Sequence, residues 1–295
     1  MSAPSGLLVI DKPDGMTSHQ VVAAVRRSLG TRRVGHAGTL DPMATGVLIV
    51  GVGAATRLLG HLAVRDKAYL ATIRLGEATT TDDREGEVTM RAPREVVDGL
   101  DEDAVRAVLG TLTGDISQVP SSVSAIKVEG RRAYDLARSG VAVELKARRV
   151  TVSRLEPLTW NRPEPGLLDI DVLVECSTGT YVRALARDAG LALGVGGHLT
   201  ALRRTRVGPW GIEEAVALDG AGLDGGLIPL DKAAARAFPV VACEAAEVAD
   251  LRHGRRIAWP QGHDATIALV GPDHRLVALA ERSGDRARTL VVFPE

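Results

Sequence analysis

The pattern of apolar and polar positions predicts a chain of short strands and amphipathic helices. Residues 6–10 are an apolar run typical of a buried strand, and a Pro-Asp-Gly turn follows. Ser18 is the expected N-cap of the next helix, and Gly30 is expected at its C-terminal end. Between them, apolar side chains recur at helical spacing: Val21, Val22, Val25 and Leu29. The first unit is therefore predicted as strand, turn and helix.

Later segments give equally local signals. Residues 67–76 alternate between apolar and polar, which predicts a half-buried strand with one face made of Tyr69, Ala71, Ile73 and Leu75. Residues 77–88 are polar and turn-rich, which predicts a surface loop or hairpin. Asp101 is the expected cap of a helix over residues 103–112, and residues 202–212 are predicted to form a strand.

Strands and helices mix without the regular alternation of a doubly wound fold. We therefore predict an α+β class with a mixed, mostly antiparallel sheet and flanking helices. The pattern over residues 119–150 predicts an arm that is basic and projects from the core. Within it we expect a strand near "SAIKVEG" and a basic helix over "RRAYDLARSG". After residue 238 the chain changes to one short helix and several brief strands. We expect two domains, residues 1–238 and a small β-rich domain over residues 239–295.

Composition narrows the class of protein. The chain has 295 residues, 45% of them hydrophobic, which is enough to bury a large core. No apolar stretch approaches the roughly 20 residues of a membrane helix, so we expect a soluble, cytoplasmic protein. Cys176 and Cys243 are far apart, with no Cys or His at metal-ligand spacing, so neither a disulfide framework nor a metal site is expected.

Charge changes this picture only locally. The formal charge of -1 argues against a protein that coats nucleic acid through overall positive charge. Arginines nonetheless occur in clusters, for example within residues 203–206 and 252–256. Such clusters usually form solvated faces, and they indicate phosphate binding only if the fold gathers them on one side.

The segment "GHAGTLDPMATG" contains the most distinctive candidate for chemistry, Asp41. Pro42 biases Asp41 toward an extended backbone, and the flanking glycines allow a ligand to approach closely. The loop can present one carboxylate to a cleft, or Asp41 can simply hydrogen-bond its own backbone in a turn. No second acid stands nearby in the sequence, so a paired-acid glycosidase is not indicated, and the Lys of a phosphate-binding loop is absent.

Three other side chains could join Asp41. Arg183 occupies the first turn of a predicted helix, where acids are preferred, so we expect it to pair with a carboxylate, and Asp41 is the obvious candidate. His36 is either a hydrogen-bonded loop residue or a ring that stacks on a base. Tyr69 is the one aromatic residue on a strand face that is otherwise aliphatic. It either packs in the core or takes part in the function of the site.

The order of these motifs along the chain carries more information than any one of them. The chain closely resembles bacterial TruB-type tRNA pseudouridine synthases, which modify uridine 55 in the T-arm, over about residues 6 to 210. The matching segments include "LLVIDKPDGMTS", "RRVGHAGTLDPMATGVLIVGVGAATRLL", "KAYLATIRLGEATTTDDREG", "VPSSVSAIKVEGRRAYDLARSG", "CSTGTYVRALARDAGLALG" and "HLTALRRTRVG". A single carboxylate suffices for such an enzyme, because it isomerises its substrate without a nucleotide, metal or cofactor.

The resemblance implies a role for each candidate. Asp41 would be the nucleophile or ion-pair stabiliser, either attacking C1′ of the ribose or assisting elimination to a glycal. Arg183 would hold it ionised, and Tyr69 would stack on the flipped base and help remove the C5 proton. His36 would fill the place of that base. The other implied substrate-binding residues are Tyr181, Leu202, which forms an apolar wall, and Lys12, which with Pro13 supports the catalytic loop.

The arm and the C-terminal domain are implied to bind RNA. The resemblance assigns residues 119–150 to an RNA-gripping insertion with phosphate contacts from Lys127, Arg131, Arg132, Arg148 and Arg149. Residues 239–295 resemble a PUA-type domain, best at "LRHGRRI". The expected partner is the tRNA T-arm stem-loop, with no obligatory protein partner. Two alternatives remain, a guide-RNA-dependent synthase and a non-catalytic chaperone that folds tRNA.

Overall fold

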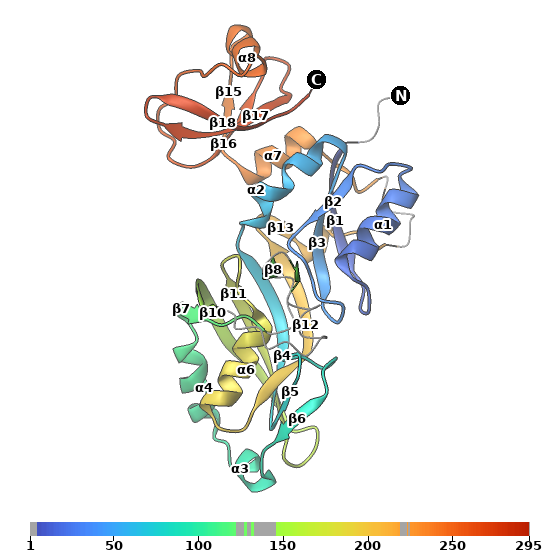
Figure 1. Ribbon diagram of the computed structural model, residues 1–295, viewed down its shortest axis with the longest axis vertical. Coiled ribbons are helices and arrows are strands. Elements are labelled where there is room, and N and C mark those ends of the chain that lie inside the picture. The colour runs from blue at the N-terminus through green and yellow to red at the C-terminus, as the bar shows by residue number, and fades with distance from the viewer. Residues whose placement is uncertain are drawn as a thin grey trace.

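The computed structural model describes residues 5–121, 127–128, 131–132, 146–218, 223 and 225–294, with only the backbone described at 127–128 and 131–132. The molecule is elongated: one long sheet with its helices forms most of the length, and a second, smaller sheet lies at one end (Figure 1).

The long sheet joins segments that are far apart in the sequence. Its strand order is β14-β1-β3-β12-β4-β11-β10-β7, with β2 paired to β3 and β13 paired to β12. Neighbours are antiparallel, except that β3 and β12 meet in parallel. Its strands are β1 (Gly6–Lys12), β2 (Val34–Ala37), β3 (Thr45–Val52), β4 (Lys67–Leu75), β7 (Gly114–Gln118), β10 (Arg148–Asn161), β11 (Leu168–Cys176), β12 (Gly197–Val207), β13 (Trp210–Gly211) and β14 (Ile228–Pro229). The predicted α+β class with a mostly antiparallel sheet is confirmed.

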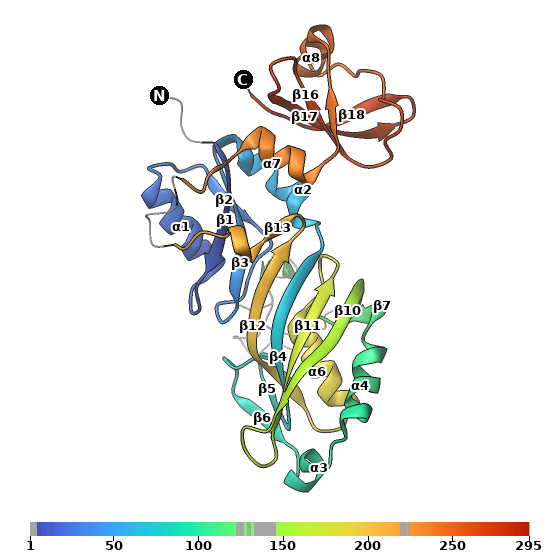
Figure 2. The ribbon, with the colours of Figure 1, turned by 180° about the vertical axis from the view of Figure 1, so that it is seen from behind.

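Helices cover the long sheet unevenly. In the described part of the chain, α6 packs against β12 and α4 against α6 and β10, whereas the opposite face of β12, β4, β11 and β10 carries no helix (Figure 2). The helices are α1 (Ser18–Ser28), α2 (Leu59–Ala63), α3 (Arg94–Asp98), α4 (Glu102–Thr111), α6 (Val182–Ala192), α7 (Leu230–Ala237) and α8 (Ala245–Arg252), with 3-10 turns η1 (Gly53–Arg57) and η2 (Ile212–Glu214).

The alternation predicted for β4 is confirmed. Its buried face contributes to the main core through Tyr69, Ala71, Ile73 and Leu75. The next segment forms a hairpin, as predicted, from β5 (Glu77–Thr79) and β6 (Val88–Arg91). However, this hairpin is not simply a surface feature, because Thr79 and Asp83 are buried.

One predicted helix cap is wrong, and a second is confirmed in position but makes no side-chain hydrogen bond. The N-cap of α1 is Thr17, whose hydroxyl accepts a hydrogen bond from the Gln20 amide. Ser18 instead points inward, and its hydroxyl accepts from the Leu40 amide at 2.9 Å. Asp101 occupies the N-cap position of α4, but its side chain makes no capping hydrogen bond. A Thr-Ser pair offers two capping hydroxyls, and here the tertiary contact with Leu40 takes one of them.

The insertion is described only in part. β8 (Lys127–Val128) and β9 (Arg131–Arg132) pair as two antiparallel strands. Arg131 and Arg132 therefore do not begin the predicted basic helix, because they pair as a strand, and its remaining residues 133–140 lie outside the described residues.

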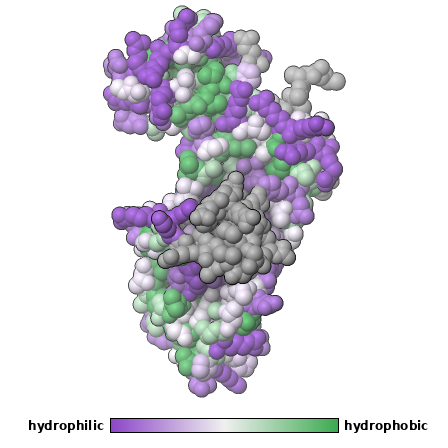
Figure 3. All heavy atoms as spheres, in the orientation of Figure 1, coloured by the Kyte–Doolittle hydropathy of each residue, from purple (hydrophilic) through white to green (hydrophobic). Residues whose placement is uncertain are grey.

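The C-terminal segment forms a separate four-stranded sheet in the order β15-β16-β17-β18, as its brief apolar runs predicted. The strands are β15 (Val240–Ala242), β16 (Ile267–Val270), β17 (Leu276–Ser283) and β18 (Arg286–Val292). With α8 they enclose a core of their own, around a buried Leu251 and Trp259. On the face of this C-terminal domain seen in Figure 3, hydrophilic side chains surround a smaller hydrophobic area. In the described ranges, we find no helix with the length and apolarity needed to cross a membrane.

Candidate active site

A cleft of about 510 Å³ opens where the loop between β2 and β3 meets the sheet. Its walls come from the loop itself, the end of α2, β4, the start of β10, β12, and the turn that leads into α6 with the first residues of that helix. The lining residues are Gly38, Thr39, Leu40, Asp41, Ala63, Lys67, Tyr69, Arg148, Thr178, Gly179, Thr180, Tyr181, Val182, Arg183, Leu202 and Arg204. The cleft thus collects Asp41, Tyr69, Tyr181, Arg183, Leu202 and Arg148 from the sequence-based set.

The loop that carries Asp41 is fixed on both sides of that residue. On one side, the Leu40 amide donates to the Ser18 hydroxyl at 2.9 Å. On the other side, the Pro42 carbonyl accepts from the Lys12 ammonium at 3.0 Å and from a backbone amide at 3.0 Å. Gly46, the second residue of β3, has a φ of +96°, and a Cβ there would lie 2.2 Å from the facing carbonyl oxygen of β12. This position therefore requires glycine.

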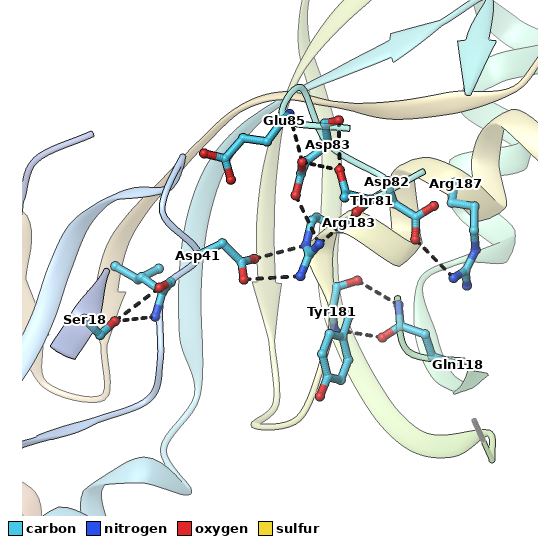
Figure 4. A network of polar contacts seen from close by, with 11 residues as sticks. Ser18, Asp41, Thr81, Asp82, Asp83, Glu85, Gln118, Tyr181, Arg183 and Arg187 are labelled. Carbon is cyan, nitrogen blue, oxygen red and sulfur yellow. Dashed lines mark hydrogen bonds and ion pairs between the residues drawn. The ribbon is translucent and has the colours of Figure 1, made fainter. Parts of the chain in front are cut away.

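Asp41 and Arg183 form the ion pair that the sequence predicted. Arg183 Nε lies 3.0 Å from Asp41 Oδ2, and Arg183 Nη2 lies 3.2 Å from Asp41 Oδ1 (Figure 4). The third nitrogen, Nη1, lies 3.1 Å from Asp83 Oδ2 and donates to the Thr81 carbonyl at 2.8 Å. Asp83 is itself held by the Thr81 hydroxyl at 2.6 Å and the Glu85 amide at 3.0 Å. The contacts with Asp83 and Thr81 therefore hold the Arg183 guanidinium in place independently of its contact with Asp41.

The cluster formed by Asp41, Asp83 and Arg183 contains two carboxylates and one guanidinium, so the carboxylates outnumber the cation. Asp83 and Arg183 are almost completely buried, with 3% and 5% of their side chains exposed, whereas 36% of the Asp41 side chain is exposed. Desolvation raises the pKa of Asp41 above its usual 3.8, and Asp83 adds to this rise, while Arg183 opposes it. The two N–H contacts with Arg183 favour the ionised form of Asp41 and offset part of this rise.

Sequence reasoning missed Asp83. It lies in a polar segment typical of any surface loop, and only the long-range contact with Arg183 distinguishes it. A second carboxylate therefore does lie near Asp41 in space, although none is near in sequence. Asp83 does not line the cleft, so the two acids do not face a common substrate as those of a glycosidase do.

The floor of the cleft is one face of the β4–β12 pair. Tyr69 faces Arg204 across the two strands, and Leu202 faces Ala71. Tyr69 and Leu202 are each 7% exposed. Desolvation raises the pKa of Tyr69 further above 10, while the positive charge of Arg204 opposes the rise, so the phenol is protonated at neutral pH.

Gln118 ties the base of the insertion to the rim of the cleft. Its side-chain amide donates to the Tyr181 carbonyl at 3.0 Å and accepts from the Tyr181 amide at 2.8 Å. The next residue, Val119, accepts at its carbonyl from Arg187 of α6 at 2.7 Å. These hydrogen bonds join the residues where the arm begins, Gln118 and Val119, to the start of α6, close to Arg183 (Figure 4).

His36 and Lys12 do not line the cleft in this structure. His36 is half-buried on β2, and its ring meets that of His19 edge-on at 5.3 Å between centroids. Desolvation lowers the pKa of His36 to about 4, so the ring is neutral near pH 7. Lys12 is fully buried, and its ammonium donates to three carbonyls, those of Pro13, Met16 and Pro42. This geometry fits support of the catalytic loop.

The basic residues of the arm are placed differently. Arg148 begins β10 and lines the cleft, while Arg149 is exposed on the same strand. Lys127, Arg131 and Arg132 lie on the β8–β9 hairpin, and their side chains are outside the described residues.

The described side chains include no cluster of three His, Cys, Asp or Glu residues that could hold a metal ion. Cys176 and Cys243 are both free and buried.

Comparisons with known sequences identify the family. A sequence model described as "TruB family pseudouridylate synthase (N terminal domain)" matches residues 26–182. The chain belongs to the TruB family of pseudouridylate synthases. Two C-terminal models of the same family, "tRNA pseudouridylate synthase B C-terminal domain" and "tRNA Pseudouridine synthase II, C terminal", match residues 183–220 and 238–294. The chain is therefore a pseudouridine synthase, an enzyme of the isomerase class.

Members of the TruB family match nearly the whole chain. The "tRNA pseudouridine synthase B" of Thermobifida fusca (strain YX) is 56% identical over 291 residues, which cover 98% of each chain. The protein of the same name from Nocardia farcinica (strain IFM 10152) is 56% identical, covering 97% of this chain and 92% of its own. Among solved structures, a chain of the Cbf5-Nop10-Gar1 complex aligns with a TM-score of 0.72 and 29% identity, over 97% of this chain and 84% of that one.

Proposed function

We propose that this enzyme converts uridine 55 in the T-arm of tRNA to pseudouridine, with Asp41 as its essential carboxylate. The relatives that share more than half of the sequence are named for action on tRNA. The single observation that carries the chemical part is the contact of Asp41 with Arg183, at 3.0 Å, in the wall of the cleft. An ionised carboxylate in this setting suits a nucleophile or a stabiliser of positive charge at C1′.

The isomerisation requires three events in the same cleft. The target nucleotide leaves the T-loop stack, and the bond between C1′ and N1 breaks while Asp41 bonds to C1′ or assists proton loss from the ribose. The detached base turns over, and C5 bonds to C1′; this step releases the Asp41 carboxylate from C1′, or in the glycal route returns the lost proton to the ribose. Finally the proton on C5 is removed and N1 gains one, so the product is an isomer of the substrate. In this scheme Tyr69 stacks on the base and assists the C5 proton, and Leu202 packs against the ring.

We infer that the enzyme works without a guide RNA or an obligatory protein partner. Relatives named for direct tRNA modification are 52–56% identical over nearly the whole chain, whereas a chain of an H/ACA RNP bound to a substrate RNA is 27% identical. The proposal divides the chain into a catalytic domain, residues 1–238, with the RNA-gripping insertion 119–150, and an RNA-binding PUA-like domain, residues 239–295. We propose the cytoplasm as its site of action and no metal or cofactor in the reaction.

Tritium release from a tRNA transcript labelled at C5 of uridine tests the proposal. The wild type should release one tritium per tRNA without added metal or cofactor, and Asp41→Asn should release none while its T-arm affinity stays within about tenfold. Transcripts in which uridine 55 is replaced by cytidine should release no tritium above background. Release from Asp41→Asn at near the normal rate would remove Asp41 from the mechanism.

Tight tRNA binding without any release by the wild type would favour the non-catalytic chaperone instead. Phosphate contacts alone need none of Asp41, Tyr69 and Arg183, so their shared cleft supports the catalytic proposal.

A further inference from the structure

Two buried cations lie on the floor of the cleft beside Tyr69. Arg204 is the cross-strand partner of Tyr69, and Lys67 precedes Tyr69 by two residues on β4, so all three side chains share one face of the sheet. Arg204 is 1% exposed and Lys67 is 7% exposed, and both line the cleft. The reaction scheme above gives neither of them a task.

Backbone carbonyls, rather than carboxylates, hold both cations. Arg204 Nε donates to the Val47 carbonyl at 2.7 Å, and Nη2 donates to the Gly38 carbonyl at 2.9 Å. The Lys67 ammonium donates to the carbonyl of Ala63, at the end of α2, at 3.0 Å and to the carbonyl of Arg65 at 2.8 Å. Within the described ranges, no carboxylate lies within 4.0 Å of either group. A buried cation normally has an anionic partner, so this floor has an excess of positive charge.

The reaction creates a negative charge at the same place. When the bond between C1′ and N1 breaks, its electron pair goes to the base, and the charge spreads over N1 and the two ring carbonyl oxygens. The charge disappears when C5 donates its electrons to C1′. Fixed cations in a water-poor cleft stabilise a transient anion strongly, because they need no reorganisation when the charge appears.

We propose that Arg204, with Lys67 beside it, stabilises the negative charge that develops on the uracil ring and retains the detached base while it turns over. The proposal rests on the proposed function, and it makes Arg204 an electrostatic element of the site. Arg204 also lies opposite Tyr69 in the strand pairing, so its charge lies beside the ring that the base stacks upon.

A matched pair of variants on β12 provides the test. Arg204→Met removes the buried charge. Arg203→Met is the control, because Arg203 is the next residue on the same strand, lies outside the cleft lining, is 41% exposed and pairs with Asp11 at 2.7 Å. Arg204→Lys keeps the charge but loses the two-carbonyl geometry. Each protein is assayed in a single turnover at saturating tRNA, with uridine or 5-fluorouridine at position 55, following loss of the original nucleoside.

The substrate comparison distinguishes electrostatic help from packing. Fluorine at C5 withdraws electrons, so the departing base carries negative charge more readily and needs less help. We expect Arg204→Met to lower the rate with uridine by about 100-fold, and the loss with 5-fluorouridine to be at least about tenfold smaller. Arg204→Lys should fall between Arg204→Met and the wild type. Arg203→Met should stay within about threefold, and the tRNA affinity of Arg204→Met should stay within about threefold because the side chain is buried.

Equal losses of rate with the two substrates, or a normal rate in Arg204→Met, would overturn the inference. If Arg204→Met does not fold, Lys67→Met decides by the same comparison: a smaller loss with 5-fluorouridine supports the inference, and equal losses overturn it. A wild type that consumes neither substrate would overturn the proposed function itself, which is a different result.

Discussion

The two carboxylates that contact Arg183 should contribute to stability in opposite ways. Asp83 and Arg183 form a buried pair with one charge of each sign, whereas Asp41 is the surplus charge and 36% of its side chain is exposed. The comparison of Asp83→Asn with Asp41→Asn therefore tests the charge balance of the site independently of catalysis.

Asp83→Asn should destabilise the fold. At the 3.1 Å separation from Arg183, an effective dielectric of about 20 gives a gross attraction of about 5 kcal/mol. Part of this is offset because Asp83 is removed from water, and Asp41 remains as a partner for Arg183. We expect a net loss of about 2–4 kcal/mol in the free energy of unfolding, within the range for breaking a buried pair. The melting temperature should fall by roughly 5–10 °C.

Asp41→Asn should leave the free energy of unfolding unchanged or raise it by up to about 1 kcal/mol at neutral pH. Burial raises the pKa of Asp41 above 3.8, so the folded protein binds a proton there more tightly than the unfolded chain does. The ionised carboxylate therefore lowers stability above the folded pKa, and this penalty disappears as the pH falls to 3.8. The effect is small because solvent screens a partly exposed charge.

Urea unfolding of the wild type and both variants, at pH 7.5 and at several lower values, measures these differences. The gain in Asp41→Asn should shrink as the pH falls. A loss of more than about 2 kcal/mol in Asp41→Asn, or no loss in Asp83→Asn, would refute the assignment of Asp83 as the structural partner and Asp41 as the surplus charge.

Three further predictions follow from the same geometry. The single-turnover rate should fall in acid with an apparent pKa above 3.8, because Asp41 acts ionised and burial raises its pKa; a limb at or below 3.8 would contradict this. Arg131→Ala with Arg132→Ala should weaken tRNA binding and reduce its salt slope by about one to two units, and an unchanged slope would return the pair to a solvated face. Gly46→Ala should cost about 2–4 kcal/mol in urea unfolding, since its Cβ would lie 2.2 Å from a carbonyl oxygen, whereas Gly60→Ala, with no atom within 4 Å, should be neutral.

Local patterns predicted the elements well, but they could not predict all of the site. The alternation in β4 placed Tyr69 correctly because side-chain direction follows from the strand period. The capping role given to Ser18 failed because a contact with Leu40, 22 residues away, takes its hydroxyl. Asp83 was missed for a similar reason, since its partner Arg183 is 100 residues further along the chain. No local period encodes such a contact.

The arginines of β12 show the same limit. Arg203 and Arg204 are adjacent in a basic segment, and a strand must send them to opposite faces. The sequence does not say which one enters the cleft. Pairing with β4 decides it, by placing Arg204 opposite Tyr69 while Arg203 pairs with Asp11. A cluster that resembled one solvated face is therefore divided between a surface ion pair and a buried charge.

The site has an excess of negative charge on one wall of the cleft and an excess of positive charge on its floor. Asp41 is a surplus anion on the loop wall, and Lys67 of β4 and Arg204 of β12 have no carboxylate partner within 4.0 Å in the described residues. Breaking a glycosidic bond also separates charge, with positive charge at C1′ and negative charge on the base. Under the proposed function, the arrangement favours one orientation, with the ribose toward Asp41 and the base over Tyr69 and Arg204. In that proposal a charge, rather than directed bonds to one ring edge, holds the anion, so the base can rotate from N1 to C5 without leaving the cleft.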